Sequence, residues 1–452
     1  MILTADNDSR NGAAETHAPI SASRFQHFLT NMPKIAIVGL GYVGLPLSLQ
    51  FAKSGAPVLG FDVDKVKTDA LNSGQSYIKH IASEDVSAAR KEGLFEATTD
   101  FSRIKEASAV IICVPTPLNK HREPDLSFVL DTGKTIAPHI KKGSVVILES
   151  TTYPGTTEVE LREVLENGSG LKAGGDFHLA FSPEREDPGN PDSKVASIPK
   201  VVGGLTPACL EAAKRIYSVA IERIVPVSSC AAAEATKLTE NIFRSVNIAL
   251  VNELKVIYQK MGIDIWEIIE AAKTKPFGFM AFYPGPGLGG HCIPIDPFYL
   301  TWKAREFGMH TRFIELAGEI NTSMPDYVVT RVSEALNDNG KAVRGSKILV
   351  VGLAYKANVD DMRESPSLIL IEKLEAKGAK VDYNDPYVPI IPHTREHDRL
   401  AGRESQPISN NFDCIVIATA HQDYDGNQIA KLRIPVIDSR RLVPPGANVY
   451  QA

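Results

Sequence analysis

Short apolar runs alternate with helix-length segments along most of the chain. In the first half, five runs predict β-strands, at residues 34–38, 58–61, 109–114, 144–148 and 178–181. The alternation restarts at Ser346, where four more runs lie at residues 347–351, 380–383, 413–418 and 436–438. Strands separated by helices form parallel sheets that those helices cover. The pattern therefore predicts two α/β units.

A long helical pattern lies between the two units. From Ala231 to about Gly262 apolar residues recur near helical spacing, and further helical sequence extends to about Asn337. A helix of this length measures about 45 Å, which is enough to span two domains or to form a dimer interface. We predict an α/β fold of two Rossmann-like parallel-sheet domains joined by a long central helix.

The composition narrows the possible functions. The chain has 452 residues and a formal net charge of −5, and no run of Lys or Arg forms a basic tail. This balance argues against a nucleic-acid partner. No apolar stretch is long enough to cross a membrane, and residues 1–31 lack the apolar segment of a signal peptide. We expect a cytoplasmic protein with no membrane partner.

The cysteines and histidines do not predict a metal site. The five cysteines are scattered and never spaced as Cys-x-x-Cys, which argues against a disulfide framework or a zinc site and favours a reducing compartment. His393 and His397 have metal-like spacing, but the sequence around them is typical of a surface.

A glycine-rich motif predicts a dinucleotide site. The strand at 34–38 leads directly into this motif, and a helical segment follows. In such a motif, Gly39 permits a tight turn, Gly41 lets the backbone approach a pyrophosphate, and Gly44 allows close packing of the helix. Asp62, at the end of the next strand, is placed to bind ribose hydroxyls, so we predict NAD rather than NADP. The cofactor contacts predicted in the loop are Gly39, Gly41, Tyr42, Val43 and Gly44.

A lone thiol in a glycine-rich segment suggests covalent catalysis. Cys292 follows Gly289 and Gly290, and Asp296 comes four residues later. A thiol is useful for oxidising an aldehyde to an acid, because the thiohemiacetal can lose a second hydride. The thiol pKa, ordinarily near 8.5, would have to be lowered by the surroundings. The alternative is a buried packing cysteine, which we expect for the other four.

Two polar residues on the long helix could stabilise an oxyanion. Lys237 and Asn241 are four residues apart and therefore project from one helix face. A cation and an amide together can stabilise a C–O⁻ group. A solvated stripe is the alternative, but the flanking sequence is apolar enough to be interior.

Several ordered motifs carry a family resemblance. Besides the glycine-rich motif, Lys237 with Asn241 and Cys292 with Asp296, they are Val114-Pro115-Thr116-Pro117, Glu149-Ser150-Thr151, Ser182-Pro183-Glu184, Lys356 and Arg363-Glu364-Ser365-Pro366. From about Pro33 to its C-terminus the chain closely resembles the UDP-glucose/GDP-mannose dehydrogenase family. The resemblance implies a four-electron oxidation of a nucleotide sugar's C6 alcohol to a uronic acid, with two NAD reduced.

The resemblance also implies roles for individual residues. Cys292 is the nucleophile, Glu184 is a general base in thioester hydrolysis, and Thr151 helps to hold the water. Asp296 is a second acid–base candidate that could orient this water or pair with Lys237, and which carboxylate takes the proton stays open. Further NAD contacts are implied for Thr116, Glu149 and Arg363, and sugar-nucleotide contacts for Phe277, Tyr283, Gly289, His291 and Lys356.

The expected domains follow from the same comparison. We expect a disordered extension at residues 1–32, an NAD-binding Rossmann-like domain at 33–228, a central helical and dimerisation domain at 229–338, and a UDP-sugar-binding α/β domain at 339–452. The long helix suggests a homodimer or a higher homo-oligomer.

The sequence around the thiol narrows the substrate. His291-Cys292 and the segment 294–300 differ from UDP-glucose dehydrogenases and resemble enzymes that act on UDP-N-acetylhexosamines. UDP-N-acetylglucosamine is the first candidate, for surface polysaccharide or lipopolysaccharide biosynthesis, with UDP-N-acetylmannosamine and UDP-glucose as alternatives. A two-electron β-hydroxyacid dehydrogenase would need neither Cys292 nor the second α/β unit, and a noncatalytic sensor would not need the complete site.

Overall fold

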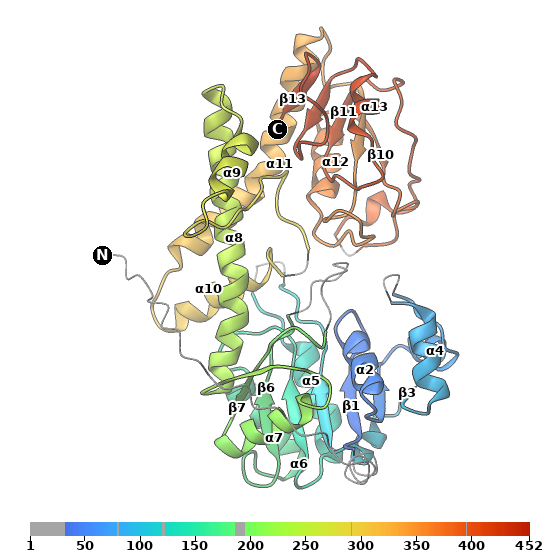
Figure 1. Cartoon of the computed structure of the whole chain (residues 1–452), viewed down its shortest axis with the longest axis vertical. Coiled ribbons are helices and arrows are strands. Elements are labelled where there is room, and N and C mark those ends of the chain that lie inside the picture. The colour runs from blue at the N-terminus through green and yellow to red at the C-terminus, as the bar shows by residue number, and fades with distance from the viewer. Residues whose placement is uncertain (1–31, 79–80, 120–122, 186–194, 291, 395) are drawn as a thin grey trace.

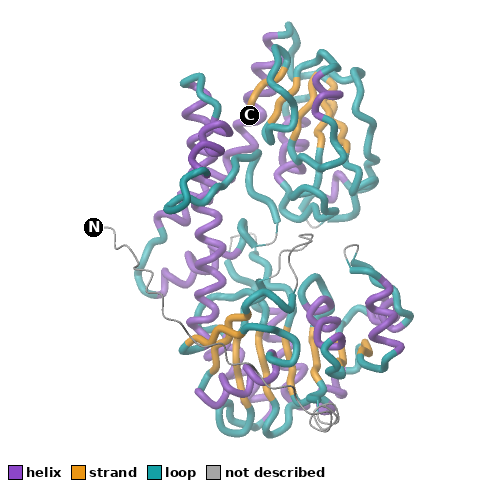
Figure 2. Tube along the Cα trace, in the orientation of Figure 1, coloured by secondary structure: helices purple, strands orange, loops and turns teal. Residues whose placement is uncertain are grey.

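The protein consists of two α/β units and a helical region between them (Figure 1). A computed structural model describes residues 32–78, 81–119, 123–185, 195–290, 292–394 and 396–452. One sheet has eight strands and the other has five, and Figure 2 shows helices packed around both. The predicted fold class is confirmed.

The first sheet has the strand order β3-β2-β1-β4-β5-β6-β7-β8. Its strands are β1 (Ile35–Val38), β2 (Val58–Phe61), β3 (Phe95–Thr98), β4 (Ala109–Ile112), β5 (Val145–Leu148), β6 (His178–Phe181), β7 (Lys200–Gly204) and β8 (Ile224–Val227). All neighbours are parallel except β6 and β7. The sequence pattern missed β3, β7 and β8. Two of these strands form the sheet edges, where less apolar surface is buried, and β8 contains Pro226.

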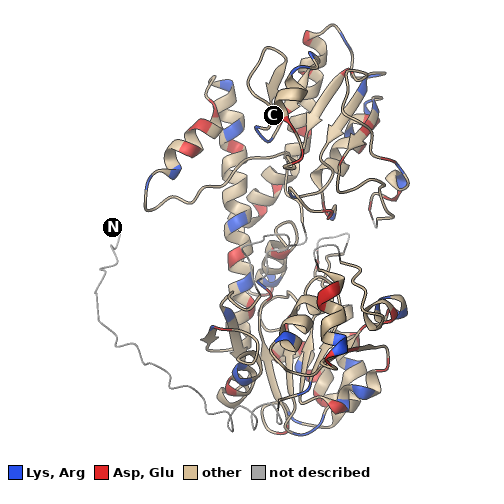
Figure 3. Ribbon diagram, turned by 45° about the vertical axis from the view of Figure 1, so that its right-hand side comes forward, with Lys and Arg blue, Asp and Glu red and all other residues tan. Residues whose placement is uncertain are grey.

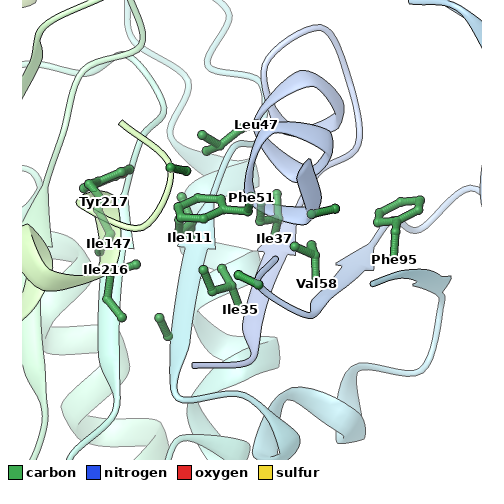
Figure 4. Packing of buried hydrophobic residues seen from close by; sticks show 14 of the residues in the cluster. Ile35, Ile37, Leu47, Phe51, Val58, Phe95, Ile111, Ile147, Ile216 and Tyr217 are labelled. Carbon is green, nitrogen blue, oxygen red and sulfur yellow. The ribbon is translucent and has the colours of Figure 1, made fainter. Parts of the chain in front are cut away.

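Alternate residues of each strand enter opposite cores. In β1, Ile35 and Ile37 pack with Phe51 and Tyr217 on one face of the sheet (Figure 4), whereas Val38 joins the core on the other face. The first core is covered by α2 (Gly44–Lys53), α4 (Ser83–Lys91) and α7 (Pro207–Tyr217), and the second by α5 (Ser127–Ile136) and α6 (Arg162–Ser169). Burial on both faces explains the nearly continuous apolar strands. The remaining helix of this unit is α3 (Lys65–Asn72).

The long helix predicted between the units is α8 (Cys230–Lys260). Its first turn packs into the core of the first sheet through Cys230 and Ala233, and at its other end Gln259 donates to the carbonyl of Gln451, 2.8 Å away, in the second unit. The helices α9 (Ile265–Lys273), α10 (Asp296–Glu306) and α11 (Arg312–Asp338) follow. The prediction that α8 spans both units is therefore confirmed.

Helix α11 completes the connection between the units. A buried hydrogen bond joins Asn252 of α8 to Asn321 of α11, with 3.0 Å from Nδ2 to Oδ1, and Asn321 also donates to the carbonyl of Ser245, 3.1 Å away. The later turns of α11 contribute Val328, Val332 and other residues to the core of the second sheet. Two packed helices therefore make the join, rather than α8 alone.

The second sheet has the order β10-β9-β11-β12-β13, with all neighbours parallel. Its elements are β9 (Lys347–Val351), α12 (Pro366–Ala376), β10 (Lys380–Asn384), β11 (Cys414–Ile417), α13 (Gly426–Ala430), β12 (Val436–Asp438) and β13 (Val449–Gln451). All four strands predicted here are present, and only the edge strand β13 was missed.

Acidic and basic residues are interspersed over both units (Figure 3). No helix among the described residues is long and apolar enough to cross a bilayer.

Candidate active site

The glycine-rich turn after β1 has one open glycine and two packed ones. Gly39 has a φ of +93°, and a Cβ added to it would lie 2.5 Å from the carbonyl oxygen of Cys113. A Cβ added to Gly44 would lie 1.8 Å from the carbonyl oxygen of Gly39. At Gly41 the same atom would meet no protein atom within 4 Å. The turn thus leaves its backbone approachable only where a pyrophosphate is expected, so the residues present fit NAD.

Asp62 is fixed against this turn. It directly follows β2 and is buried. Its Oδ2 accepts a hydrogen bond from the Leu40 N–H, at a distance of 3.0 Å. Its Oδ1 accepts from the Asp64 N–H, also over 3.0 Å. The carboxylate is therefore held at the end of the strand next to β1, the predicted ribose position.

The second unit reaches the same turn through Arg363. Its guanidinium carbon lies 4.5 Å from the ring centroid of Tyr42, within the range of a cation–π interaction. The Arg363 side chain also pairs with Asp361, with 2.5 Å between Nη2 and Oδ2. The structure therefore brings together two predicted cofactor contacts from opposite ends of the chain.

Cys292 and Asp296 lie at the start of α10. The Asp296 N–H donates to the Cys292 carbonyl over 2.8 Å, which places the thiol residue just before the first helical turn. Asp296 is buried, and it accepts a hydrogen bond from the amide of Asn241 on α8.

Lys237 is buried one turn before Asn241. Its Nζ lies 3.0 Å from Oε2 of Glu184 and 2.5 Å from the Glu184 carbonyl oxygen. Glu184 follows β6, at the carboxyl end of the strand. The hypothesis that Asp296 pairs with Lys237 is not what the structure shows. Lys237 pairs with Glu184, and Asp296 is hydrogen-bonded to Asn241.

Burial controls the proton affinities in this group. It raises the pKa of Cys292 to about 11, with the charge of Asp296 adding to the effect and Lys237 opposing it. Burial also raises the pKa of Asp296 to about 7, against Lys237 and Asn241. For Lys237 burial lowers the pKa, but Glu184, Cys292 and Asp296 outweigh it, so the pKa is raised. The expectation that the surroundings lower the thiol pKa is wrong for this structure.

The glycines before the thiol pack against the second unit. A Cβ on Gly289 would lie 2.6 Å from Cβ of Tyr355, and one on Gly290 would lie 2.8 Å from the Tyr355 ring. The Gly290 N–H donates to the Arg363 carbonyl over 3.1 Å. Lys356 adjoins Tyr355 in this contact region, whereas His291 lies outside the described residues.

Two aromatic residues of the 277–290 loop, Phe282 and Tyr283, pack against helices α8 and α9. Tyr283 stacks on Trp266 of α9, with ring centroids 5.4 Å apart, and donates to Glu270 over 2.5 Å. Phe277 is 70% exposed. These contacts are packing contacts, so the substrate roles of Phe277 and Tyr283 stay predictions.

The remaining predicted residues, Thr116, Glu149 and Thr151, follow strands β4 and β5. The Thr116 carbonyl accepts from the buried Tyr299 of α10 over 2.8 Å, which links this cofactor-side loop to the helix that Asp296 begins. Glu149 is buried and ion-paired with Lys200, and it accepts from Tyr217 over 2.6 Å. Thr151 lies after β5, the neighbour of β6, and hence at the sheet edge that carries Glu184. The predicted NAD contact of Glu149 stays a prediction.

The sequence analysis missed three cationic residues, Arg244, Lys255 and Arg440. Arg244 donates to the amide oxygen of Asn241, and its position three residues later on α8 was a usable signal. Lys255 is buried and donates to the Gly285 carbonyl over 3.2 Å, and a Cβ on Gly285 would lie 2.5 Å from Nη1 of Arg440. Burial and the charge of Arg440 lower the pKa of Lys255 to about 7. Nothing in the sequence joins Lys255 to Arg440.

The chain matches the UDP-glucose/GDP-mannose dehydrogenase family over most of its length. It matches the NAD binding domain over residues 33–221, the central domain over 231–323 and the UDP binding domain over 349–452. The chain belongs to this family. It is an NAD-dependent nucleotide-sugar dehydrogenase, and bound NAD supplies the hydride acceptor. Where its domains begin and end, as expected from the sequence, stays a prediction.

Relatives with different sugars resemble this dehydrogenase. It is 37% identical over 392 residues to a UDP-N-acetyl-D-glucosamine 6-dehydrogenase of Pseudomonas aeruginosa, covering 86% of this chain and 91% of the relative. An NDP-N-acetyl-D-galactosaminuronic acid dehydrogenase of Ralstonia solanacearum is 34% identical, with 90% and 95% covered. The solved structure of a UDP-D-ManNAc dehydrogenase from Pyrococcus horikoshii matches with a TM-score of 0.83 and 34% identity, over 92% and 98% of the two chains.

Two glycine substitutions should separate cofactor binding from packing. We expect Gly41→Ala to fold like the wild type but to raise the KM for NAD about tenfold, on the order of 1.4 kcal/mol, because the methyl group occupies the pyrophosphate approach. Gly44→Ala should lower the free energy of unfolding by about 1–3 kcal/mol, the range for overpacking. Thermal unfolding and NAD titrations check both. A Gly41→Ala protein as unstable as Gly44→Ala, or one with unchanged NAD kinetics, would contradict this assignment.

Proposed function

We propose that the dehydrogenase oxidises the C6 alcohol of a UDP-N-acetylhexosamine, UDP-N-acetylglucosamine first, to the uronic acid through a Cys292 thioester. The observation that carries this proposal is the buried group in which the Cys292 thiol lies within the electrostatic reach of Lys237, Glu184 and Asp296. The group lies where the segment before α10 meets α8 and the end of β6.

The first oxidation transfers a hydride from C6 to NAD, and the hydroxyl proton passes to a base, for which Glu184 and Asp296 are the carboxylates of this group. The ammonium of Lys237 and the amide of Asn241 are the groups placed to stabilise negative charge on the C6 oxygen, since both are buried and carry N–H donors. Both donors bind carboxylates in the structure, so each would have to turn partly toward the sugar.

The second oxidation passes through sulfur. The Sγ–C6 bond forms as the thiol adds to the aldehyde carbonyl, and the thiol proton is transferred to the carbonyl oxygen, which becomes the hydroxyl of the thiohemiacetal. Because the pKa of Asp296 is raised to about 7, its carboxylate can accept a proton near neutral pH. Loss of a second hydride from C6 to NAD, and of the hydroxyl proton to one of the two carboxylates, leaves a thioester, which water cleaves to the acid and the thiol. Glu184 and Asp296 both stay candidates for the base in this last step.

The sugar assignment rests on the loop around the thiol and on the relatives. The His291-Cys292 sequence and the segment 294–300 resemble enzymes for N-acetylated sugars. The similar proteins include enzymes named for UDP-N-acetyl-D-glucosamine and for UDP-N-acetyl-D-mannosamine. We place UDP-N-acetylmannosamine second and UDP-glucose third, with surface polysaccharide biosynthesis as the setting.

The test is the number of NADH released per sugar nucleotide. With excess NAD and limiting UDP-N-acetylglucosamine we expect about two NADH and a uronate, since each hydride removed from C6 reduces one NAD. UDP-N-acetylmannosamine and UDP-glucose are the matched comparisons, and product mass identifies the acid. Two NADH from another sugar alone would move the substrate, whereas one NADH with an accumulating aldehyde would overturn the thioester scheme.

We also propose a homodimer formed through α8. Phe243, Leu250 and Ile257 are spaced seven residues apart, and each is nearly half exposed. This stripe lies opposite the face of α8 that buries Asn241 and Asn252. A helix with an exposed apolar stripe opposite its buried face is typical of one that packs against a second copy as well as its own core.

A charge in this stripe should break the oligomer. We expect Leu250→Asp to halve the particle mass or to move the dissociation constant by at least about tenfold, because a carboxylate would be buried in an apolar interface. Val66→Asp, at an exposed apolar residue of α3, is the control. Light scattering measures both. An unchanged mass for Leu250→Asp, or a monomeric wild type, would contradict the proposal.

A further inference from the structure

A fully buried histidine–aspartate pair lies in the second unit, outside the group around Cys292. Nε2 of His421 is 2.9 Å from Oδ2 of Asp385, and neither side chain is exposed. Asp385 also accepts from the N–H groups of Leu353 and Ala354, over 2.6 and 3.0 Å. Burial raises the pKa of Asp385, but these bonds and His421 outweigh it, so the pKa is lowered.

The other ring nitrogen of His421 holds a turn. Nδ1 lies 2.9 Å from the Asn358 backbone N, whose hydrogen points to it. An N–H donor requires a lone pair on Nδ1, so the ring proton is on Nε2 and is donated to Asp385. Asn358 has a φ of +64°, a left-handed conformation that a residue other than glycine keeps only when its surroundings hold it. Tyr387 stacks on the ring with centroids 4.8 Å apart, and Tyr424 meets it edge-on.

The held turn, residues 353–358, carries the contact with the cysteine loop. Tyr355 lies against Gly289 and Gly290, and Lys356 is its neighbour. The Thr419 hydroxyl donates to the Ala354 carbonyl over 2.6 Å, which fixes the turn from a third side. His421 therefore contacts the cysteine loop only indirectly, through the turn at 353–358.

The corresponding aspartate of the first unit shows what is different here. Asp62 and Asp385 each follow the second strand of their sheet in chain order, and each accepts from the N–H of the leucine that follows a positive-φ glycine, Leu40 or Leu353. Near Asp62 that turn is the predicted cofactor site. Oδ2 of Asp385 accepts a hydrogen bond from His421 in addition to those from Leu353 and Ala354. In the second unit the aspartate therefore links the histidine to the turn.

We propose that His421 is a positioning residue for the sugar-nucleotide site, which holds the 353–358 turn, and with it Tyr355 and Lys356, against the cysteine loop. The proposal rests on the function proposed above and on the sugar-nucleotide contact that the family resemblance implies for Lys356. Only the bond to Nδ1 from Asn358 is required for positioning, while the bond from Nε2 supplies a donor to the Asp385 carboxylate and fixes the ring tautomer.

Two amide substitutions separate these bonds. His421→Asn puts an amide oxygen near the Nδ1 position and can still accept from Asn358, whereas His421→Gln puts an amide near the Nε2 position and can only reach Asp385. We expect His421→Gln to raise the KM for the sugar nucleotide roughly tenfold, the factor for one buried hydrogen bond, with kcat near the wild-type value. His421→Asn should stay closer to wild type. His421→Phe keeps the stacked ring without either bond and should behave like His421→Gln.

Hydrogen exchange of the Asn358 amide supplies a readout that does not depend on turnover. We expect faster exchange in His421→Gln than in His421→Asn, and calorimetry with UDP alone should show the same order of affinities. Equal KM, UDP affinity and exchange in the two variants, or a greater loss in His421→Asn, would overturn the positioning role. A wild type that oxidises none of the three sugar nucleotides would instead overturn the proposed function, and exchange at Asn358 would still decide the role of His421.

Discussion

The site depends on keeping an ammonium charged inside the protein. Lys237 is buried, and its charge is retained because Glu184 accepts from it at two positions and because the carboxyl group of Asp296 adds negative potential. A buried cation without such partners would lose its proton. Its helix must therefore be fixed against both the end of β6 and the start of α10, which explains why α8 is anchored in the first unit and continues to the second.

Contacts between distant segments hold the cofactor and thiol loops in register. Arg363 stacks on Tyr42 with its side chain and accepts from Gly290 with its carbonyl, so one residue of the second unit contacts both loops. Tyr299 links α10 to the loop at Thr116 in the same way. A movement of the second unit would change both loops together, which suits a reaction in which cofactor and sugar must be aligned twice.

The sequence predicted what is encoded locally. Strands buried on both faces appear in the sequence as continuous apolar runs, and the tight turn after the first strand requires glycine at 39 and 44. The spacing of Lys237 and Asn241 puts them on one helix face. Edge strands were missed because they bury less. Pairings across the chain, such as Lys237 with Glu184, were not readable from spacing, and neither was the burial that raises the pKa of Cys292. His421 gave no signal, because its role depends on a turn more than sixty residues away in sequence.

The central claim is that the sugar becomes covalently attached to Cys292, and the most direct test is the mass of the peptide that contains this residue. Enzyme in steady-state turnover with NAD and UDP-N-acetylglucosamine would be quenched in acid, with the wild type compared to Glu184→Gln, in which hydrolysis should slow. We expect the acyl mass of the sugar nucleotide on the Cys292 peptide, removable by hydroxylamine, and none on the Cys113 peptide. An unmodified Cys292 in both proteins, while each sugar still yields two NADH, would contradict the account.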